Sequence, residues 1–508
     1  MNVVIDSFRR FYVKGRPLVI YEKSVVQKNE CTFFLVREGV EKKLVILSRG
    51  SGLHPISSFE VAERGEFRVG DEAYVLAVCP CSHANILALR KILHFLCPQR
   101  AGLKAAVGMG DRIGLVTPGH IRAVKAGIFP VFAQQSVREL SRTGRTFDDV
   151  LDDVSWAVFQ EGYRDEFGAD ADHLKSIEDV DKAVRAGYTM FTVDPSEYVD
   201  NDVERYGLKE LEEKFAALPW CNLGCDIKSF QNLYVGKKVT IGKNVFVFTQ
   251  QSLFKTAVKY SAAIAFTTKV FRYIKTVLGH EDFDFEMSVD ETEVPTSLLE
   301  HAFIALELRR LNVKVTSLAL RFVGRFEKAI DYMGDLEEFD DSFKKHVFIA
   351  KAFGPYKISI HSGSDKFTIF PVLGRFASDL IHLKTAGTSY LEALRIVARH
   401  EPMLFREIVL FALKRFDEDK KAYDVTTDLS LVPNPNKILD SKLESAYLDD
   451  NNGRQLLHIT YGSVLTTKKA SGEWIYRNRI FRCLMEHEDE LYETVAKHLR
   501  RHVEAIWS

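Results

Sequence analysis

The sequence predicts an α/β protein built on a (β/α)8 barrel of the TIM type, with a small α/β domain before the barrel and a helical extension after it. Three observations predict this class. Strand-like and helix-like segments alternate from Lys104 to about residue 400, the helix starts carry capping residues, and one strand between two helices has a polar face. A chain of 508 residues exceeds what a single core requires, so several domains are expected.

The first region, residues 1–100, is expected to form a small α/β domain. Its predicted elements are strands at Thr32–Arg37, Lys43–Leu47 and Tyr74–Val78, a turn at Gly39, and an amphipathic helix at Ala84–Leu96. No residue in this region carries obvious chemistry. We therefore interpret it as an appended structural domain.

The second region, residues 101–400, is the predicted barrel. Its expected strands are Lys104–Gly108, Phe129–Gln134, Ala169–His173, Tyr188–Asp194, Phe283–Asp290, Val315–Val323, Tyr356–His361 and Leu380–Lys384. Eight strands alternating with helices are what a (β/α)8 barrel requires. The segment at about residues 199–251 is predicted to be an insertion after the fourth strand, and its role is left open, with a lid as one alternative.

The helices of the barrel have clear start and stop signals. The expected caps are Thr146 with Asp149, Ser176 with Asp179, and Ser297 with Glu300, and the expected stops are Gly187 and Gly354. The third region, residues 401–508, is predicted to be mainly helical and to pack on the barrel. It ends in one amphipathic helix near Arg477–Trp507.

The stretch Phe283–Glu293, FDFEMSVDETE, carries the strongest functional signal. Apolar and polar residues alternate along it, and the polar set contains three carboxylates. A parallel strand between helices should be apolar on both faces, and an unpaired buried ion costs several kcal/mol. In a closed barrel the polar face points inward and its last residues line the mouth. The carboxylates are therefore either paired structural ions or a site, and we favour a site.

Composition excludes several functional classes. Lys and Arg (69) nearly balance Asp and Glu (70), so no overall field favours nucleic acid or an anionic membrane as a partner. No apolar run approaches the ~18 residues of a spanning helix, and the start MNVVIDSFRRFYVKG lacks a secretory signal, which predicts a cytoplasmic protein. The seven scattered cysteines are expected to be reduced, buried thiols.

Polar residues gather where the predicted strands end, which is where barrel active sites lie. They are Gln134, Gln135, Ser136, Asp172, His173, Thr192, Asp194, Glu286, Asp290, Glu291, Arg321, His361, Lys366, His382 and Lys384. Alternation places His361 on the same face as Lys357 and Ser359. So many strand ends with polar side chains indicate one shared site.

Three histidines in this set, His173, His361 and His382, lie beside carboxylates. A single histidine is usually structural, but this grouping makes a divalent metal about as plausible as a structural role. Imidazole and carboxylate ligands suit Zn, Mn, Ni or Fe, and Asp194 and Asp290 remain open as further ligands.

The cations Arg321, Lys366 and Lys384 would suit an anionic substrate, or they compensate the acidic strand ends. A nicotinamide cofactor is not expected, because VGMGDRIG has one residue too many before its third glycine for a dinucleotide fingerprint.

Several long segments resemble the tagaturonate epimerase family. They are GMGDRIGLVTPGHIRA, FAQQSVREL with SRTGRT, FQEGY with FGADADH, FTVDPSEYV, FDFEMSVDETEVPTS, YKISIHSGSDKF, LKTAGTSYLEA, RQLLHITYGSVL and ETVAKHLRRHV. The resemblance covers nearly the whole chain. Two departures are Leu140 in place of an expected Asn, near Ser136, and a longer Cys221–Val247 segment.

The resemblance implies a metal-dependent enzyme that interconverts D-tagaturonate and D-fructuronate in galacturonate breakdown. It implies Asp172 as proton acceptor, Glu286 as proton donor and His173 as metal ligand, with His361 and His382 as the expected further ligands. Ser136, Thr192, Arg321, Lys366 and Lys384 are expected to contact an anionic keto sugar acid; a homo-oligomer is left open.

The two ketouronates differ at a carbinol β to the ketone. Simple enolisation cannot invert that carbon, so we expect retro-aldol cleavage and recondensation. The alternatives are a metal-dependent aldolase or lyase acting on sugar acids, and a non-catalytic protein that binds sugar acids.

Overall fold

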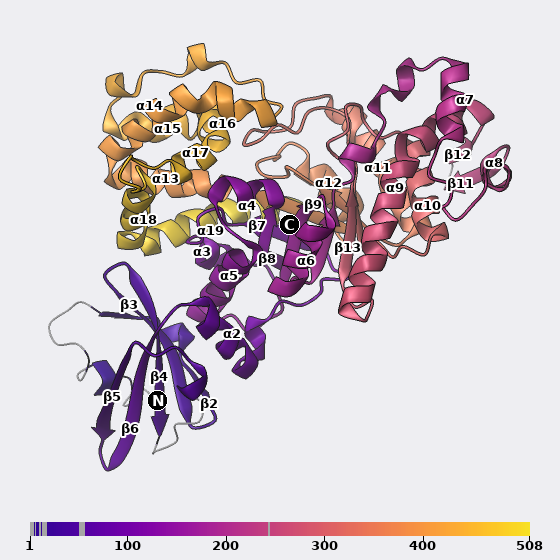
Figure 1. Ribbon diagram of the computed structural model, residues 1–508. Helices are drawn as coiled ribbons and strands as arrows, with labels where there is room; N and C mark the ends of the chain where they lie inside the picture. Colours follow the sequence, from indigo (N-terminus) through magenta and orange to yellow (C-terminus); the bar gives the residue numbers. More distant parts are fainter. Residues whose placement is uncertain are drawn as a thin grey trace.

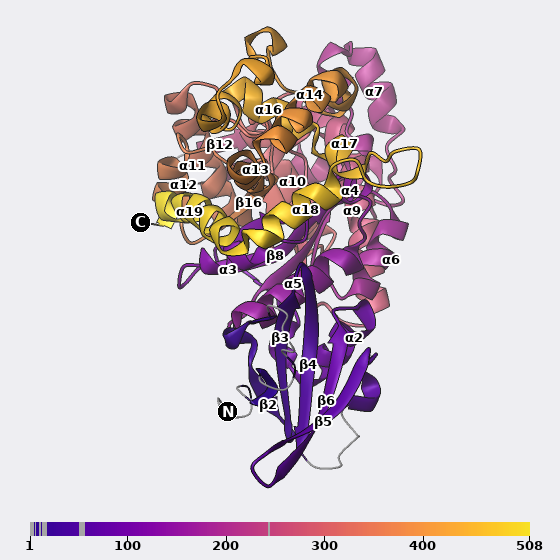
Figure 2. The ribbon, with the colours of Figure 1, turned by 90° about the vertical axis from the view of Figure 1, so that its left-hand side faces the viewer.

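The computed structural model describes residues 5, 7–9, 12, 18–49, 56–241 and 244–507. Within them, an antiparallel sheet near the N-terminus, a closed parallel barrel and a group of C-terminal helices occupy separate parts of the molecule (Figure 1). The sheet lies at one end, and the C-terminal helices lie beside the barrel (Figure 2). The predicted barrel class is confirmed.

The N-terminal region is mainly an antiparallel sheet with strand order β1-β3-β4-β6-β5, and β2 pairs with β3. Its strands are β1 (Leu18–Ile20), β2 (Val26–Lys28), β3 (Cys31–Glu38), β4 (Glu41–Arg49), β5 (Glu63–Val69) and β6 (Glu72–Pro80). The turn between β3 and β4 contains Gly39 at φ +61°, which is the predicted turn. The predicted helix is α2 (His83–Ile92), followed by the short 3-10 turn His94–Leu96.

Eight parallel strands close the barrel in the order β10-β13-β14-β15-β16-β7-β8-β9. They are β7 (Ala106–Gly110), β8 (Phe129–Ser136), β9 (Gly168–Leu174), β10 (Met190–Val193), β13 (Asp284–Ser288), β14 (Ser317–Ala319), β15 (Lys357–Ile360) and β16 (Ile381–Ala386). Each lies within or overlaps the segment that the alternation of strands and helices predicted.

Helices surround the barrel, and those that follow Thr146, Ser176 and Ser297 begin where these capping residues predicted. The surrounding helices are α3 (Thr117–Arg122), α4 (Val137–Thr143), α5 (Phe147–Glu161), α6 (Ile177–Ala186), α9 (Gln250–Leu278), α10 (Leu298–Arg310), α11 (Leu336–Phe353), α12 (Phe370–Ala377) and α13 (Thr388–His400). Thr146, Ser176 and Ser297 accept the capping hydrogen bonds, and Gly187 and Gly354 follow the ends of α6 and α11.

The insertion after β10 packs on the outside of the barrel. It contains short 3-10 turns, α7 (Leu208–Ala216), α8 (Ile227–Tyr234) and the hairpin β11 (Lys238–Ile241) and β12 (Asn244–Val247). Helices α7 and α8 lie against α9 (Figure 1). Among the described residues, those that line the mouth of the barrel from outside it come from the C-terminal region, at Lys421, Tyr423 and Asp424. The structure therefore does not place the insertion as a lid.

The C-terminal region is helical, as predicted. It contains α14 (Pro402–Asp419), α15 (Leu443–Tyr447), α16 (Asn451–Ile459), α17 (Tyr461–Thr466), α18 (Arg477–Glu486) and α19 (Glu488–Trp507). The prediction of one helix over Arg477–Trp507 is wrong, because the chain breaks at His487, whose ring stacks on His400 at 3.5 Å. Helix α19 packs on α3, α12 and α13.

None of the helices in the described residues is both long and apolar enough to cross a membrane. All seven cysteines are free thiols, as the scattered spacing predicted. The expectation that they are buried holds for Cys31, Cys79 and Cys483 and is wrong for Cys221, which is exposed.

Candidate active site

The interior of the barrel is charged rather than apolar. Strand β13 presents Asp284, Glu286 and Ser288 to it, and all three are almost fully buried. Lys357 on β15 and Lys384 on β16 are buried in the same interior. The polar face of the FDFEMSVDETE strand therefore points into the barrel, and its carboxylates meet cations from other strands.

Lys384 is the centre of this charge network. Its Nζ lies 2.8 Å from Asp170 Oδ2, 2.8 Å from Asp172 Oδ1 and 3.0 Å from Glu286 Oε1. It also donates to Thr192 Oγ1 at 2.8 Å, and Thr192 in turn donates to Asp170 at 2.8 Å. An ammonium has three protons, so these oxygens saturate Lys384. It joins the two predicted acid–base carboxylates, Asp172 and Glu286, into one unit.

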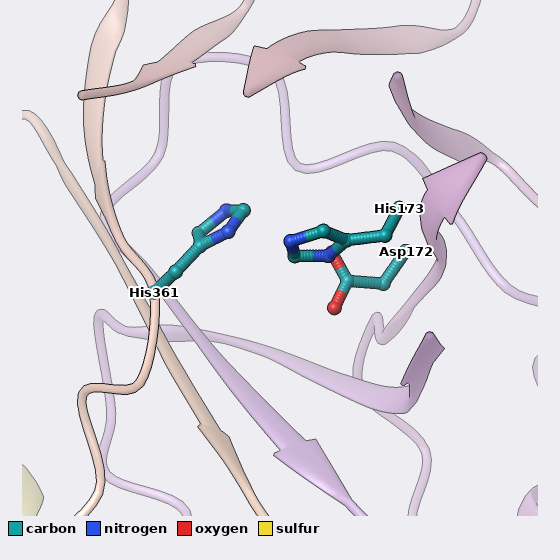
Figure 3. A group of neighbouring side chains, drawn as sticks. All are labelled: Asp172, His173 and His361. Carbon is teal, nitrogen blue, oxygen red and sulfur yellow. The ribbon is translucent and has the colours of Figure 1, made fainter. Parts of the chain in front are cut away.

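Two imidazoles from different strands face each other above this network. Figure 3 shows the rings of His173 and His361 turned toward one another, with Asp172 beside His173. Their centroids are 4.9 Å apart. His361 Nε2 lies 2.6 Å from Glu286 Oε1, and Asp290 Oδ1 lies 3.2 Å from His361 Nδ1 and 3.7 Å from His173 Nε2. Acids and imidazoles from three strands or their ends therefore share one basin.

The backbone at His173 explains how two consecutive residues reach the same basin. Side chains alternate along a regular strand, so neighbours point to opposite faces. His173 has φ +54°, in the left-handed region, and the pairing of β9 with β10 shifts register nearby. This conformation is uncommon for a residue with a Cβ. It ends the alternation and lets Asp172 and His173 both face the basin.

The carboxylates and imidazoles of the basin shift one another's pKa values. Burial opposes ionisation of Asp172, but His173, Lys384 and His361 together hold its pKa well below the ordinary value. Lys384 and His361 do the same for Glu286 against the effect of burial. Burial lowers the pKa of His361, but Asp290 and Glu286 outweigh this effect and raise it to about 9. The basin therefore holds ionised carboxylates close to imidazoles.

The donor set fits a divalent cation. Asp172, His173 and His361 offer ligand atoms that lie within 4.8 Å of one another. Neither ring nitrogen of His173 makes a well-directed hydrogen bond to a described residue, nor does Nδ1 of His361. Two imidazoles and a carboxylate suit Zn, Mn, Fe or Ni, and Asp290 adds a fourth donor within reach of both rings.

The structure places the other predicted site residues in different surroundings. His382 is fully buried, and its Nδ1 lies 3.7 Å from Glu286 Oε2. It does not belong to the group of possible metal ligands formed by Asp172, His173 and His361. The carboxylate of Asp194 is engaged by other partners: it accepts from Ser196 N at 2.9 Å and pairs with Lys175 at 3.3 Å. Its role as a ligand remains a prediction that these contacts do not support.

The predicted substrate-binding residues fall into two groups, those that line the site and one that does not. Ser136 lines the inner chamber, where its hydroxyl caps α4 through Glu139. Arg321 lines the outer basin. Lys366 is fully buried, and its Nζ donates to the backbone oxygens of Glu327 at 2.8 Å, Ile330, and Ser364 at 3.2 Å. Lys366 is therefore already satisfied by backbone carbonyls, outside the cluster that Lys384 organises.

Some site residues did not come from the sequence analysis. Asp170 alternates with Asp172 in GADADH, and that spacing could have identified it as inward-facing. Arg112 lies inside the GMGDRIG segment that resembles the family, but the sequence assigned it no role. Lys328 and Tyr423 line both hollows, yet no local pattern marks them, because the loop after β14 and the C-terminal region bring them there.

Two connected hollows form the site. An inner chamber of about 40 Å³ is lined by the ionisable groups of Asp172, His173, His361 and Lys384, among others. An outer basin of about 740 Å³ opens above it, and Asp290 and His361 line both. A small polar molecule could bind across the two with one end on the charged network.

Fold and site define a (β/α)8-barrel protein with a buried imidazole–carboxylate centre at the carboxyl ends of its strands, where barrel enzymes hold their active sites. The family model described as tagaturonate epimerase matches residues 21–506. The chain belongs to the tagaturonate epimerase family, which confirms the resemblance seen in the sequence.

Proteins that match this chain over its whole length support the same family assignment. A tagaturonate/fructuronate epimerase from Thermotoga maritima is 45% identical over 505 residues, covering 99% of this chain and 100% of the relative. Crystal structures of a fructuronate-tagaturonate epimerase from Cohnella laeviribosi, native and with glycerol, superpose with a TM-score of 0.90 at 36% identity. They cover 100% of this chain and 99% of that one.

Proposed function

We propose that this protein is a metal-dependent epimerase that interconverts D-tagaturonate and D-fructuronate. The observation that carries the proposal is the single basin in which Asp172 and Glu286, both bound to Lys384, lie beside His173 and His361. Membership in the family supplies the substrates, since the relatives bear both names. The anionic ketouronate is the partner that we expect, with no role for a nicotinamide cofactor.

His173, His361 and a carboxylate, Asp172 or Asp290, would hold the divalent cation. When bound, such a cation acts as a Lewis acid that polarises the ketone and stabilises negative charge developing on its oxygen. Glu286 lies too deep to be its main ligand, because its oxygens contact Lys384 at 3.0 Å, His361 at 2.6 Å and Ser317. Glu286 is instead placed to exchange protons with Asp172 through Lys384, which contacts both carboxylates.

The residues of the chain would then act on the carbinol to be inverted, which is β to the ketone. Asp172 accepts the hydroxyl proton as the bond between the α carbon and the carbinol carbon breaks. The aldehyde half turns its other face and the bond re-forms. The proton taken up by Asp172 passes through Lys384 to Glu286 and from there returns to the oxygen. Lys384 contacts both carboxylates, so protonation of one carboxylate changes the proton affinity of the other. The two therefore titrate as a coupled unit.

Deuterated solvent tests the reaction path. Retro-aldol cleavage leaves the C–H bond at the inverted carbon intact, so nuclear magnetic resonance should show no deuterium there after full interconversion of tagaturonate. Stoichiometric deuterium at that carbon would overturn this path. Removal of metal by a chelator should abolish turnover, and adding back Zn, Mn, Ni or Fe in turn should restore it with the cognate ion.

The second candidate function is an aldolase or lyase on the same barrel. The same groups would cleave the bond, but the fragments would leave instead of recombining. Product analysis separates the two functions, because a lyase accumulates a three-carbon keto fragment and a three-carbon aldehyde acid. The epimerase returns six-carbon acids only.

A further inference from the structure

We propose that Nη1 of Arg112 binds the carboxylate of the substrate and retains the carboxylate-bearing half of the molecule while its bond to the keto half is broken. This inference depends on the proposed epimerase function for the second part, but the carboxylate contact can be tested without turnover. It assigns a role to a residue that the family motif GMGDRIG contains and that the acid–base network does not use.

Arg112 is held rigidly at the edge of the inner chamber. Its side chain is almost fully buried, its Nε donates to Glu139 Oε1 at 2.8 Å, and its Nη2 lies 2.7 Å from the same oxygen. Glu139 is itself fixed, because its other oxygen accepts from the backbone N–H of Ser136 at 3.1 Å in a capping box. One side of the guanidinium is therefore committed to Glu139.

The remaining contacts orient the guanidinium plane. The Tyr461 ring centroid is 3.8 Å from Arg112 Cζ, and Nη2 is 3.3 Å from His458 Nε2. Gly387 has φ +96°, and a Cβ there would lie 2.5 Å from Arg112 Cζ. The glycine at residue 387 is thus needed for the guanidinium to occupy this place.

The orientation leaves Nη1 without a hydrogen-bond partner among the described residues, although the atom is buried. Arg112 lines the same inner chamber as Asp172, His173 and Lys384. Leaving a buried donor unpaired costs about 1–3 kcal/mol. An anion bound in the chamber would remove that cost, and a carboxylate is the matching acceptor.

Most other cations near the site are already engaged, and Lys357, whose Nζ also makes no hydrogen bond to a described residue, lines neither hollow. Lys384 contacts four oxygens, and Lys366 donates to three backbone carbonyls. Lys328 donates to Ser362 Oγ at 2.6 Å, and Arg138 pairs with Glu291 at 2.8 Å. Arg321 has an unpaired Nε but lines the outer basin only. Arg112 therefore fits the carboxylate better than the residues predicted from the sequence.

The chemistry explains why this contact matters. When the bond to the carbinol carbon breaks, its electron pair passes to the keto half, which becomes an enediolate, and the carbinol carbon becomes an aldehyde. The substrate's carboxylate is on the aldehyde half, which then has no covalent tie. A contact to one nitrogen holds that half in the chamber and still lets it turn before the enediolate attacks its other face and the oxygen regains its proton.

The test compares an acid with its neutral counterpart. Calorimetric titration of tagaturonate and of tagatose into metal-loaded wild type, Arg112→Met and Arg112→Lys gives the acid-to-neutral affinity ratio. We expect the wild type to prefer the acid by at least tenfold, Arg112→Met to lose that preference, and Arg112→Lys to keep part of it. The ratio within one protein does not depend on the fraction that is folded. Arg142→Met is the matched control, because Arg142 contacts backbone oxygens of Ile459 and Asp419.

An acid preference that survives in Arg112→Met overturns the proposal, and its loss in Arg321→Met alone would assign the carboxylate to Arg321. Product analysis tests the second part: we expect Arg112→Met to release free three-carbon fragments from tagaturonate more often per turnover than wild type does. If wild type fails to interconvert the two acids, the proposed function fails, while the binding ratio still decides the role of Arg112.

Discussion

Two buried clusters of imidazoles and carboxylates in this protein look alike by composition and differ in what surrounds them. In the first, Asp172, His173 and His361 line the chamber. In the second, Asp365, His498 and His502 bring ligand atoms equally close together. In each cluster the ligand atoms lie within 4.8 Å of one another.

Two of the three residues of the second cluster are occupied by protein partners. Arg454 Nη2 donates to Asp365 Oδ2 at 2.5 Å, while His498 Nε2 lies 2.9 Å from Asp365 Oδ1 without a well-directed hydrogen bond. His502 Nε2 accepts from the backbone N–H of Asp365 at 2.9 Å, and its Nδ1 lies 3.0 Å from the carbonyl of His498. These bonds fix the loop after β15 to α19. Proximity of ligand atoms alone thus does not define a metal site; nitrogens must also be free and accessible.

The largest expected difference between the clusters is in turnover. Replacing Glu286 with Gln removes the proposed proton donor and is expected to lower kcat about 10²–10⁴-fold. Glu392 Oε1 lies 3.6 Å from His498 Nδ1 in the second cluster. Glu392→Gln should leave kcat within about twofold of wild type, because Glu392 takes no part in the proposed reaction. Steady-state assays on tagaturonate measure both. Unchanged turnover in Glu286→Gln would remove that residue from the mechanism.

Metal content sharpens the same comparison. Loss of an outer-shell partner costs 10–100-fold in metal affinity, so His173→Ala or His361→Ala, which removes a ligand, should cost at least about 100-fold. His502→Ala should retain wild-type metal content by elemental analysis, because its Nε2 is already used by Asp365 N–H. Equal loss of metal in all three variants would show that the distinction between the clusters is wrong.

The free energy of unfolding should depend more on the second cluster than on the first, which is the reverse of the order expected for turnover and metal content. Asp365→Asn leaves Arg454 and His498 without their buried anion and is expected to lower the free energy of unfolding by about 3 kcal/mol. Denaturant unfolding of the metal-free protein measures this. Asp172→Asn is the matched control, and a smaller loss is expected, since it removes a charge from a basin that is crowded with carboxylates. A larger loss in Asp172→Asn would contradict this difference.

The smallest expected effect is a pH dependence from His498. Burial lowers its pKa, but Asp365 and Glu392 outweigh burial and Arg454, so the pKa stands above the ordinary 6.5. A raised folded-state pKa contributes stability that is complete below pH 6.5 and is lost as the pH rises through the folded-state pKa. The free energy of unfolding should therefore fall as the pH rises above 6.5. The total decrease is about 1.4 kcal/mol for each unit by which the folded-state pKa exceeds 6.5. His498→Gln should flatten this part of the curve; an identical slope in both proteins would exclude His498 as its source.

Much of the fold was predictable because it depends on local patterns. Alternation in FDFEMSVDETE and in the strand ending at His361 predicted inward polar faces, and capping residues such as Thr146 predicted helix starts. The break at His487 was missed because the helical spacing of apolar residues continues across it, from Leu484 in α18 to Leu491 in α19. The role of the insertion could not be predicted, because the length of an insertion does not reveal the surface on which it packs.

The sequence by itself determined the barrel, the family, and the residue types from which a metal and acid–base site can be built. These follow from periodicity and motifs, which are properties of neighbouring residues. Only the tertiary structure decided that Lys384 joins Asp172 to Glu286, that Lys366 is held by backbone carbonyls, and that Arg112 has a free nitrogen. Whether a charge is satisfied depends on atoms brought from distant parts of the chain, and no local pattern specifies them.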